Sequence, residues 1–440
     1  MLVLGTLGKQ VMNIILFEDS AAKQLAPVSL TRPAWAIRCA SFRLIDWIEP
    51  IASHITSFVR PHLQTLQLND WPNFNQSTST SDEPTLVVNA RFAPTVSNAN
   101  FLKAFANLEG STKSDRIILV RNGWAVAAAI VPGKIALSID SNTETDRASE
   151  LERLAKENDL DIVNKEIAFE LLSYPHDIIG NHMNGCAAAV EHRIKHGNYA
   201  EVASNVFVAK SEQQTSIPAN TVFDTSEGPV IFESNVSIGP FCFFRGPVHV
   251  GANSKISEHS SIKDSVAISH TCKMGGEIEG VQTESWSNKQ HFGFLGHSYI
   301  GSWINLGAGT CNSDLKNTYG TVNMVYGDRK VSTGMQFVGC VMGDYSRTAI
   351  NTSIYTGKLI GVGSTVYGMT PHNVPSFVNC AQMLKQTGVL PPEVLVSIQK
   401  RMFGRRNVTQ RPCDIQLIHD VFAITQHQRD ESWSTDPISF

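Results

Sequence analysis

The sequence predicts an α/β domain followed by a parallel β-helix of hexapeptide repeats. Aliphatic side chains return at every sixth position in the second half, as at Val230, Val236, Cys242 and Val248. A helix repeats near 3.6 residues and a strand near 2. A period of six therefore indicates a coil of short strands, in which one residue in six points into a narrow core. Ile-Gly and Leu-Gly pairs recur at the same points, and glycine suits a tight corner because it has no Cβ atom.

The six-residue row continues over most of the second half. Further members, in chain order, are Ile256, Ile262, Ile268, Met274, Phe294, Ile300, Leu306, Met342, Ile354, Ile360 and Val366. Ordinary strands in a β-sandwich would show a period of two instead. The row disappears between Thr310 and Phe337, which predicts an excursion from one corner of the coil. Such insertions often lie on the binding face.

The first domain is expected over residues 12–200. Strand patterns alternate there with helical ones, which favours a largely parallel sheet. The expected strands are 13–17, 85–89, 116–120 and 125–131, and the expected helices are 41–55 and 145–157, with a polar loop at 73–84.

A connecting helix is expected at 176–197, before a β-helix over 204–372. Residues 373–440 are expected to form a helical tail that covers the open end of the coil. Its helices are predicted at 377–385, 392–406 and 414–425.

Composition excludes several classes of function. The chain has 440 residues, so two or three domains are expected. Its net charge of −4 implies no basic face for nucleic acid. No apolar run reaches the length of a membrane span, and the residues before Met12 are too short and weakly flanked for a signal peptide.

The cysteines and histidines predict no metal site. The eight cysteines form no CxxC pair and no zinc-ligand spacing, so free thiols in a reducing cytoplasm are expected. His192 and His196 are four residues apart on the connecting helix, but HExxH is absent. A solvated helix face is the favoured interpretation of that pair.

Two segments of the coil carry a family resemblance. They are GPFCFFR at 239–245 and HFGFLGHSYIGSWINLGAGT at 291–310. They resemble the acetyltransferase half of the bifunctional enzyme that makes UDP-N-acetylglucosamine, which joins a uridylyltransferase domain to a left-handed β-helix. Residues 288–320 are more closely similar to a divergent bacterial branch of that family, classed as sugar nucleotidyltransferases. The resemblance implies a left-handed coil, acetyl-CoA and a sugar phosphate as substrates, UTP for the first domain, and a homotrimer.

The resemblance also implies roles for single residues. His291 matches the catalytic histidine, which takes a proton from the amine of glucosamine 1-phosphate as the nitrogen attacks the thioester of acetyl-CoA. Arg245 matches a phosphate-binding arginine, and Asn305 matches a sugar-contacting asparagine. Further candidate substrate contacts on the excursion are Asn312, Asp314 and Lys316.

Each of these residues also has a structural interpretation. His291 could make a corner hydrogen bond, Arg245 a surface ion pair, and Asn305 a left-handed turn. The excursion residues could be solvated. The family's tyrosine three residues after the histidine is Phe294 here, and its second basic residue falls near the acidic Glu277 and Glu279. The tail carries Lys400, Arg401, Arg405, Arg406 and Arg411, which could meet CoA phosphates or form a solvated helix end.

The first domain departs further from the family. No Gly-rich loop follows its first strand, where such loops cradle phosphates. Pro27 to Pro33 resembles the stretch that comes next, with Arg32 and Arg38 as possible phosphate contacts. Asn89 and Arg91 stand where the family binds Mg²⁺ through aspartate, and asparagine is a poorer ligand because it lacks charge. The domain is either a modified nucleotide site or a degenerate scaffold.

Three functions follow from these patterns. The first is a cytoplasmic acetyl-CoA-dependent N-acetyltransferase of an amino-sugar 1-phosphate, fused to a uridylyltransferase-like domain. The second is a sugar-1-phosphate nucleotidyltransferase whose coil serves only assembly. The third is a nucleotide-sugar sensor without catalysis.

Overall fold

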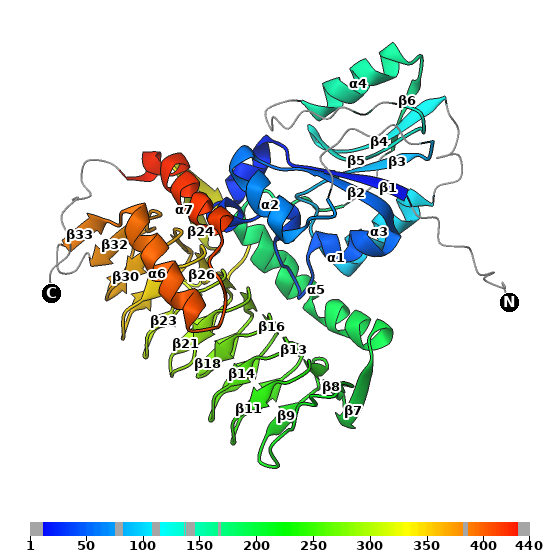
Figure 1. Ribbon diagram of the computed structural model, residues 1–440. Coiled ribbons are helices and arrows are strands. Elements are labelled where there is room, and N and C mark those ends of the chain that lie inside the picture. Colours follow the sequence, from blue (N-terminus) through cyan, green and yellow to red (C-terminus); the bar gives the residue numbers. More distant parts are fainter. Residues whose placement is uncertain are drawn as a thin grey trace. The chain divides into compact units, whose positions relative to one another are not determined.

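The computed structural model describes residues 12–74, 82–107, 115–135, 137, 146–165, 169–381 and 386–429. They divide into two compact units (Figure 1). The first unit contains residues 12–23, 32–37 and 42–173, and the second contains 24–31, 38–41 and everything from 174 on. Two short segments near the N-terminus therefore belong to the unit that the C-terminal half builds.

The first unit contains a six-stranded sheet with the order β2-β1-β3-β5-β4-β6. Its strands are β1 (Met12–Phe17), β2 (Ala52–Phe58), β3 (Thr85–Asn89), β4 (Arg116–Asn122), β5 (Ala125–Val131) and β6 (Asp161–Lys165). The predicted sheet is present and parallel except at β5, which runs antiparallel to β3 and β4. Only a tight turn with Gly123 at φ 58° joins β4 to β5, and such a connection permits only antiparallel pairing.

The helices of the first unit are short. They are α1 (Leu44–Ile48), α2 (Gln64–Asp70), α3 (Val96–Ala106) and α4 (Arg147–Glu157), with 3₁₀ turns η1 (Ser20–Leu25), η3 (Ala34–Ala36), η4 (Glu49–Ile51) and η5 (Pro61–Leu63). The helix expected at 41–55 was predicted too long, because residues 52–55 belong to β2. Pro50 prevents α1 from continuing. Part of the polar loop and residue 145 lie outside the described residues.

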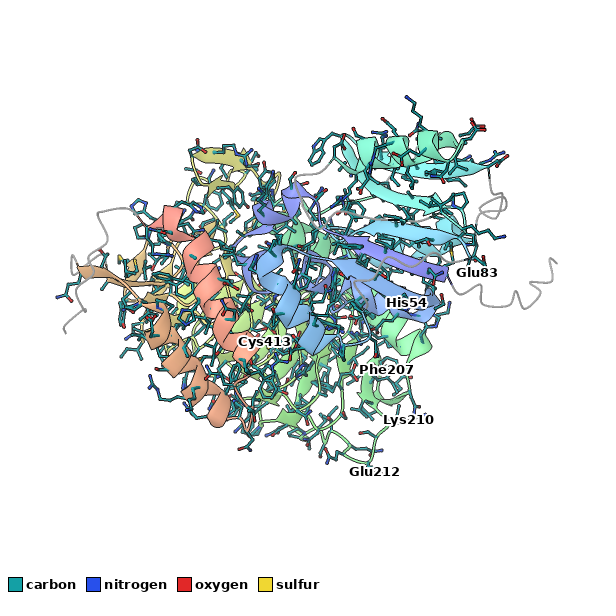
Figure 2. All side chains as sticks on the ribbon, turned by 45° about the horizontal axis from the view of Figure 1, so that its top comes forward. His54, Glu83, Phe207, Lys210, Glu212 and Cys413 are labelled. Atoms are coloured by element: carbon teal, nitrogen blue, oxygen red, sulfur yellow. The ribbon has the colours of Figure 1, made fainter. Side chains whose placement is uncertain are left out.

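The second unit is a three-sided coil of short, parallel strands. Its first face contains β8 (Val206–Ala209), β10 (Val230–Phe232), β13 (Val248–Val250), β16 (Val266–Ile268), β19 (Gln282–Thr283), β22 (Tyr299–Ile300), β26 (Cys340–Met342) and β29 (Lys358–Ile360). β7 (Tyr199–Ala203) closes this sheet by pairing antiparallel to β8. Figure 2 labels Phe207 of β8 and Lys210 and Glu212 beyond it, at the start of the coil.

The other two faces alternate with the first along the chain. The second contains β11 (Ser237–Ile238), β14 (Lys255–Ile256), β17 (Lys273–Met274), β20 (Asn288–Lys289), β27 (Arg347–Thr348), β30 (Thr365–Val366) and β32 (Val378–Ala381). The third contains β9 (Val222–Asp224), β12 (Phe243–Arg245), β15 (Ser261–Lys263), β18 (Glu277–Glu279), β21 (Phe294–Gly296), β23 (Cys311–Asn312), β28 (Ser353–Ile354) and β31 (Met369–Thr370). The predicted β-helix is thus confirmed.

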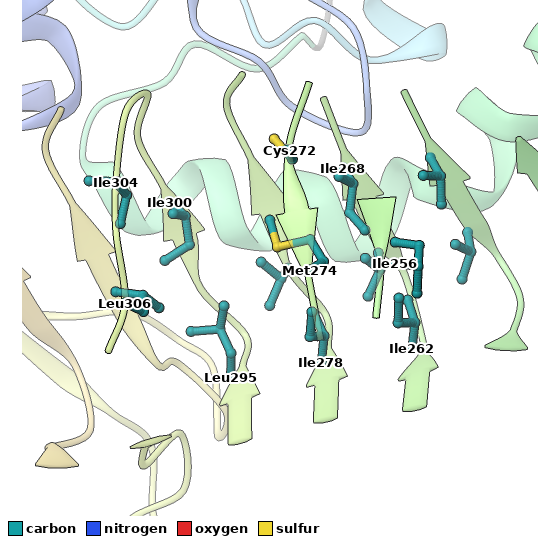
Figure 3. Close-up of a cluster of buried hydrophobic side chains, with 14 of the residues drawn as sticks. Ile256, Ile262, Ile268, Cys272, Met274, Ile278, Leu295, Ile300, Ile304 and Leu306 are labelled. Atoms are coloured by element: carbon teal, nitrogen blue, oxygen red, sulfur yellow. The ribbon is translucent and has the colours of Figure 1, made fainter. Parts of the chain in front are cut away.

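The core of the coil consists of the six-residue row. Ile256, Ile262 and Met274 are buried between the three faces (Figure 3). One member of the predicted row is wrong: Phe294 is only partly buried, and Leu295 takes the inward position. The six-residue spacing of core side chains is interrupted at this point because the length of one coil changes.

The change lies at two corners. Corner B joins the second face to the third, and corner C joins the third to the first. Register pairs Val248 with Val266, 18 residues on, but pairs Ala267 with Gln282 after only 15. Corner B has four residues at 257–260 and at 290–293, but only two at 275–276. The third missing residue is at corner C, because Lys263 pairs with Glu279, 16 residues on, and Ala267 pairs with Gln282 after only 15. We call residues 275–276 the notch, because this corner B turn is shorter than those of the coils before and after it.

The predicted excursion is an antiparallel hairpin. It contains β24 (Asn323–Tyr326) and β25 (Arg329–Ser332), between β23 and β26. The helix expected at 377–385 was wrong, because residues 378–381 form β32, which pairs with β30 and with β33 (Gln386–Val389). Val378 and Cys380 extend the apolar row, so this segment continues the coil. Residues 382–385 lie outside the described part.

Three helices accompany the coil. α5 (Pro175–His196) packs Cys186 and Val190 against Ile231 of the first face. α6 (Pro392–Gly404) places Phe403 over Trp303, with ring centroids 4.5 Å apart. α7 (Pro412–Ile424) carries the buried Cys413, labelled in Figure 2. The remaining 3₁₀ turns are η2 (Val28–Thr31) and η7 (Gln426–Gln428), and all eight cysteines are free thiols.

Candidate active site on the coil

His291 lies at corner B, the second residue of the turn at 290–293. It is exposed, as is Phe292 beside it, and no described residue hydrogen-bonds its ring. Its backbone carbonyl accepts a hydrogen bond from the buried ammonium of Lys289 at 2.8 Å. The corner is therefore fixed through its backbone while the imidazole faces solvent beside the notch, and the ring can accept a proton from a bound substrate.

A cluster of cations lies on the second face, before corner B. Lys255 and Lys273 are in register on adjacent strands and both side chains point outward. Arg406 approaches the next strand and donates to Asn288 Oδ1 at 2.7 Å, and Arg405 is its neighbour. Burial and then the charges of Arg406, Lys255 and Arg405 lower the pKa of Lys273. Like charges in register repel one another, so this cluster favours an anionic ligand.

The cation cluster and His291 are close along the chain. Asn288, which holds Arg406, begins β20, the strand before this corner, and lies only three residues before His291. Three residues of extended chain span at most about 10 Å. Of the tail cations named from the sequence, Arg405 and Arg406 belong to this cluster, whereas Arg411 pairs with Asp414 at the start of α7 at 2.8 Å.

Arg245 and Lys263 lie in register on the outer side of the third face, beyond corner B. Arg245 forms a fork with Asp264, which holds its pKa above the usual value. Lys263 bridges Glu277 at 3.0 Å and Glu279 at 3.3 Å. Sequence reasoning missed Lys263: the acidic pair near 277 and 279 has a basic partner, supplied by the preceding coil.

A cavity of about 620 Å³ adjoins Arg245 at corner C. It is lined by Ala187, Asp224, Ser226, Glu227, Arg245, Gly246, Pro247, Asp264 and Ser265. Three carboxylates against one guanidinium suit an amine or hydroxyl groups better than a bare phosphate. His291 is three strands further along the coil, about 14 Å at the usual strand spacing. The structure therefore does not bring Arg245 and His291 into one pocket of this chain.

The remaining coil candidates have different neighbours. Asn305 is exposed on the second face, bridging β20 and β27 rather than occupying a left-handed corner. Asn312 is buried, and its amide bonds both backbone groups of Gly296, at 2.8 and 3.0 Å. Lys316 donates to the carbonyl of Thr321 at 2.7 Å and closes the start of the excursion.

At corner C, a carboxylate oxygen of Asp314 lies 2.8 Å from Nδ1 of His297, within hydrogen-bond distance. The ring of Phe337 stacks on His297, with centroids 5.2 Å apart. Both ends of the excursion are thereby attached to one histidine. This pairing gives Asp314 a structural role that spacing could not reveal.

In the first unit, the predicted phosphate contacts are engaged internally. Arg91 donates to Asp19 at 2.6 and 2.7 Å and to the carbonyl of Leu172 at 2.6 Å. Asn89 donates to Asp19 at 2.8 Å and to the carbonyl of Val126 at 2.9 Å. All five of these residues are buried. These residues do not fit Mg²⁺, because the only carboxylate among them is occupied by a guanidinium.

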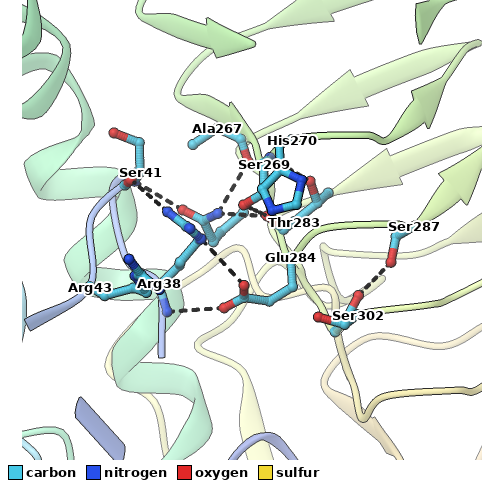
Figure 4. Close-up of polar contacts among 12 residues, drawn as sticks. Arg38, Ser41, Arg43, Ala267, Ser269, His270, Thr283, Glu284, Ser287 and Ser302 are labelled. Atoms are coloured by element: carbon cyan, nitrogen blue, oxygen red, sulfur yellow. Dashed lines mark hydrogen bonds and ion pairs between the residues drawn. The ribbon is translucent and has the colours of Figure 1, made fainter. Parts of the chain in front are cut away.

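The two other arginines differ in position. Arg32 is partly buried, and its carbonyl accepts a hydrogen bond from Arg60 at 3.2 Å. Arg38 belongs to the second unit, where its backbone N–H donates to Glu284 at 3.1 Å and its guanidinium pairs with the same carboxylate (Figure 4). Nearby, the backbone N–H of Ser41 donates to Gln282 at 3.0 Å. Arg38 thus attaches the N-terminal segment to the coil.

Among the residues that the structure describes, no group of three or more His, Cys, Asp or Glu side chains is placed to hold a metal ion. The rings of His192 and His196 are 4.2 Å apart on α5, but within the described part of the chain they belong to no such group of three. No helix in this described part is long and apolar enough to cross a membrane.

The fold and site define a class: a sugar nucleotidyl transferase-like unit followed by a hexapeptide coil. Residues 14–191 match the family model described as sugar nucleotidyl transferase. Part of the chain is also similar to the bifunctional GlmU proteins, which agrees with the resemblance seen in the sequence.

Two such relatives illustrate the distance. The Bifunctional protein GlmU of Paraburkholderia phytofirmans is 27% identical over 175 residues, covering 35% of each chain. That of Synechococcus elongatus is 25% identical over 194 residues, 41% of this chain and 39% of the relative. The match therefore spans well under half of either relative. A solved acetyltransferase domain of PglB from Neisseria gonorrhoeae covers 82% of this chain and 93% of its own, at 9% identity and a TM-score of 0.15. That overlap is too poor to bear on function.

Proposed function

We propose that the coil is an acetyl-CoA-dependent N-acetyltransferase acting on an amino-sugar 1-phosphate, with glucosamine 1-phosphate as the first substrate to test. The observation that supports it most is the position of His291. It is an exposed, unbonded imidazole at a corner, among the described residues, between the cation cluster on one face and the Arg245 and Lys263 column on the next.

The chemistry needs no covalent intermediate on the protein. The amine nitrogen of the sugar attacks the thioester carbonyl of acetyl-CoA and forms the amide bond. His291 takes the proton that the nitrogen loses, the carbon–sulfur bond breaks, and the CoA thiolate leaves and is protonated. A positioned general base contributes about 10²–10⁴-fold to such a rate.

The cation cluster suits the phosphates of CoA. Lys255, Lys273, Arg405 and Arg406 form a patch whose mutual repulsion an anion would relieve. One member of the cluster, Arg406, bonds Asn288 on β20, the strand that leads into the His291 corner, so the flexible arm of CoA can extend from the cluster toward the imidazole. Asn305, on the adjacent strand, is a candidate contact along that course.

The sugar phosphate is proposed to bind on the third-face side. Glu277 and Glu279 can accept hydrogen bonds from the amine or hydroxyl groups of the sugar, and Lys263 and Arg245, each already paired with a carboxylate of this chain, are the candidate contacts of its phosphate. We further propose a homotrimer, because Arg245 and His291 are too far apart in one chain to hold one small substrate, and a neighbouring copy can complete the site. Light scattering tests this.

The test of the main proposal follows thiol release from acetyl-CoA with glucosamine 1-phosphate. We expect His291→Ala to lower kcat by about 10²–10⁴-fold. The matched control is His259→Asn, an exposed histidine at the corner B turn 257–260, which should keep full activity. Absence of thiol release in the unmodified protein, or equal losses in both variants, contradicts the proposal.

The same assay tests the CoA site. Lys273→Ala and Arg406→Ala should each raise the KM for acetyl-CoA by about tenfold, equivalent to about 1.4 kcal/mol. The KM for the sugar phosphate should not change, and added salt should weaken the effect. Lys210→Ala, an exposed lysine at the start of the coil, is the control.

A second candidate is sugar-1-phosphate nucleotidyl transfer, favoured by the family match of residues 14–191. Pyrophosphate release from UTP and N-acetylglucosamine 1-phosphate would support it. Binding of both substrates without turnover of either would instead favour a nucleotide-sugar sensor.

A further inference from the structure

A lysine occupies the aliphatic row of the coil. Register on the second face aligns Ile238 with Ile256, Ile256 with Met274, and Met274 with Lys289. The first three are core residues, and Lys289 is only 3% exposed. Its side chain therefore points into an interior that accepts isoleucine or methionine at the same position of neighbouring coils.

The ammonium of Lys289 bonds the backbone of two successive corners. It donates to the carbonyl of Gly275 at 2.9 Å and to the carbonyl of His291 at 2.8 Å. Gly275 belongs to the shortened turn at 275–276, and His291 belongs to the full turn that follows. The space left by the shortened turn is where the ammonium lies.

The neighbouring glycine supports this arrangement. Gly276 has φ 77°, and a Cβ atom there would lie 2.9 Å from the lysine nitrogen and from the carbonyl oxygen of His291. Only glycine fits this position without displacing the ammonium or the turn. The positions of Lys289, the shortened turn at 275–276 and Gly276 therefore depend on one another.

An interior charge weakens the core relative to an apolar residue. Burial lowers the pKa of Lys289 to about 8, because the interior solvates the charged ammonium less well than water does. Met274 shows that an apolar side chain can fill the row. Stability of the coil therefore does not explain the lysine, whereas its bond to the corner of His291 does.

We propose that Lys289 is a positioning residue, which holds the turn at 290–293 from inside the coil and so sets the direction of the exposed His291 ring. This inference rests on the proposed function of His291 as the general base. Lys289 does not contact the substrate; it acts on the base through one peptide group.

The first experiment does not depend on activity. Deuterium uptake of the turn at 290–293 should increase in Lys289→Met, while uptake at the corner 257–260 stays the same. Met274→Leu, in the same row one coil earlier, is the control and should leave both turns unchanged. Unchanged uptake at 290–293 in Lys289→Met overturns the proposal.

The second experiment is a double-mutant cycle. Lys289→Met should lower kcat by about ten- to a hundredfold, as expected for a misdirected base, while both KM values stay within about twofold. In the His291→Ala background it should have no further effect, because its action passes through that ring. An equal loss in both backgrounds, or no loss, overturns the proposal.

Two additions keep the outcomes separate. If Lys289→Met fails to fold, Lys289→Gln takes its place in the test, because glutamine keeps an N–H donor. Lys289→Gln should then retain more activity than another polar replacement such as Lys289→Ser. Equal activities of these two variants would contradict the positioning role. If the unmodified protein releases no thiol, the proposed function fails, and deuterium uptake alone still decides whether Lys289 holds the corner.

Discussion

In the first unit, Arg91 and Asn89 are buried, and all three guanidinium nitrogens of the arginine donate to Asp19 or to the carbonyl of Leu172. In the second unit, His291 is exposed and Lys255 and Lys273 face outward without a carboxylate partner among the described residues. The same kinds of side chain therefore stabilise one unit and remain available to ligands in the other. A polar residue at a family position indicates a site only where its bonds are not already made within the protein.

The largest effect is expected on removal of Arg91, which tests whether this arginine stabilises the first unit or binds a ligand. Arg91→Ala leaves Asp19 buried and unpaired, and breaking a buried pair destabilises by about 3–5 kcal/mol. We expect the urea midpoint of the first unit to fall accordingly. Arg116→Ala, which breaks the exposed pair with Asp115, should leave the midpoint almost unchanged. An unchanged midpoint with lost UTP turnover would instead make Arg91 a ligand residue.

A second test contrasts two histidines of the coil unit. His182 is fully buried, its Nε2 lies 2.6 Å from the carbonyl of Ser265, and burial lowers its pKa from 6.5 to about 4. Since the unfolded chain binds the proton first, stability is fully present above pH 6.5 and is lost as pH falls toward 4. The loss is up to about 3 kcal/mol.

The measurement is the urea midpoint of the coil across that pH range. His182→Asn should flatten the acid decline, whereas His291→Ala should leave it as it is, because the His291 ring is exposed and no described residue hydrogen-bonds it. Identical declines in His182→Asn and the unmodified protein would show that His182 is not the group concerned.

The smallest effect on stability is expected at Arg245. Its pair with Asp264 is partly exposed, so Arg245→Ala should cost at most about 1 kcal/mol. The KM for the sugar phosphate should nevertheless rise if the third face binds it. A stability loss as large as that of Arg91→Ala would place Arg245 with the structural arginines.

The sequence allowed prediction of the coil because its core repeats. Ile256, Ile262 and Ile268 recur at a constant spacing, and constant spacing is what a periodicity search detects. Phe294 was assigned to the core in place of Leu295 because Leu295 precedes the next core residue, Ile300, by five positions, whereas Ile262 precedes Ile268 by six. A fixed period has no means of representing a corner of different length.

The candidate site was only partly predictable for a related reason. The motif around His291 lies within one short segment, so the sequence alone was enough to propose it as a site. The partners of Asp314, Arg91 and Arg38 lie 17, 72 and 246 residues away in the chain. Pairings at such separations are set by the fold, and no local pattern encodes them.

The two N-terminal segments within the second unit have a consequence for how the chain is made. Thr31 donates to Asp344 at 2.8 Å across 313 residues of sequence, and η2 reaches its place only when the late coils exist. A ribosome delivers the N-terminal half first. That half must therefore wait, with residues 24–31 and 38–41 undocked, until most of the solenoid has been synthesised. Deleting the late coils would leave η2 without the residues against which it docks.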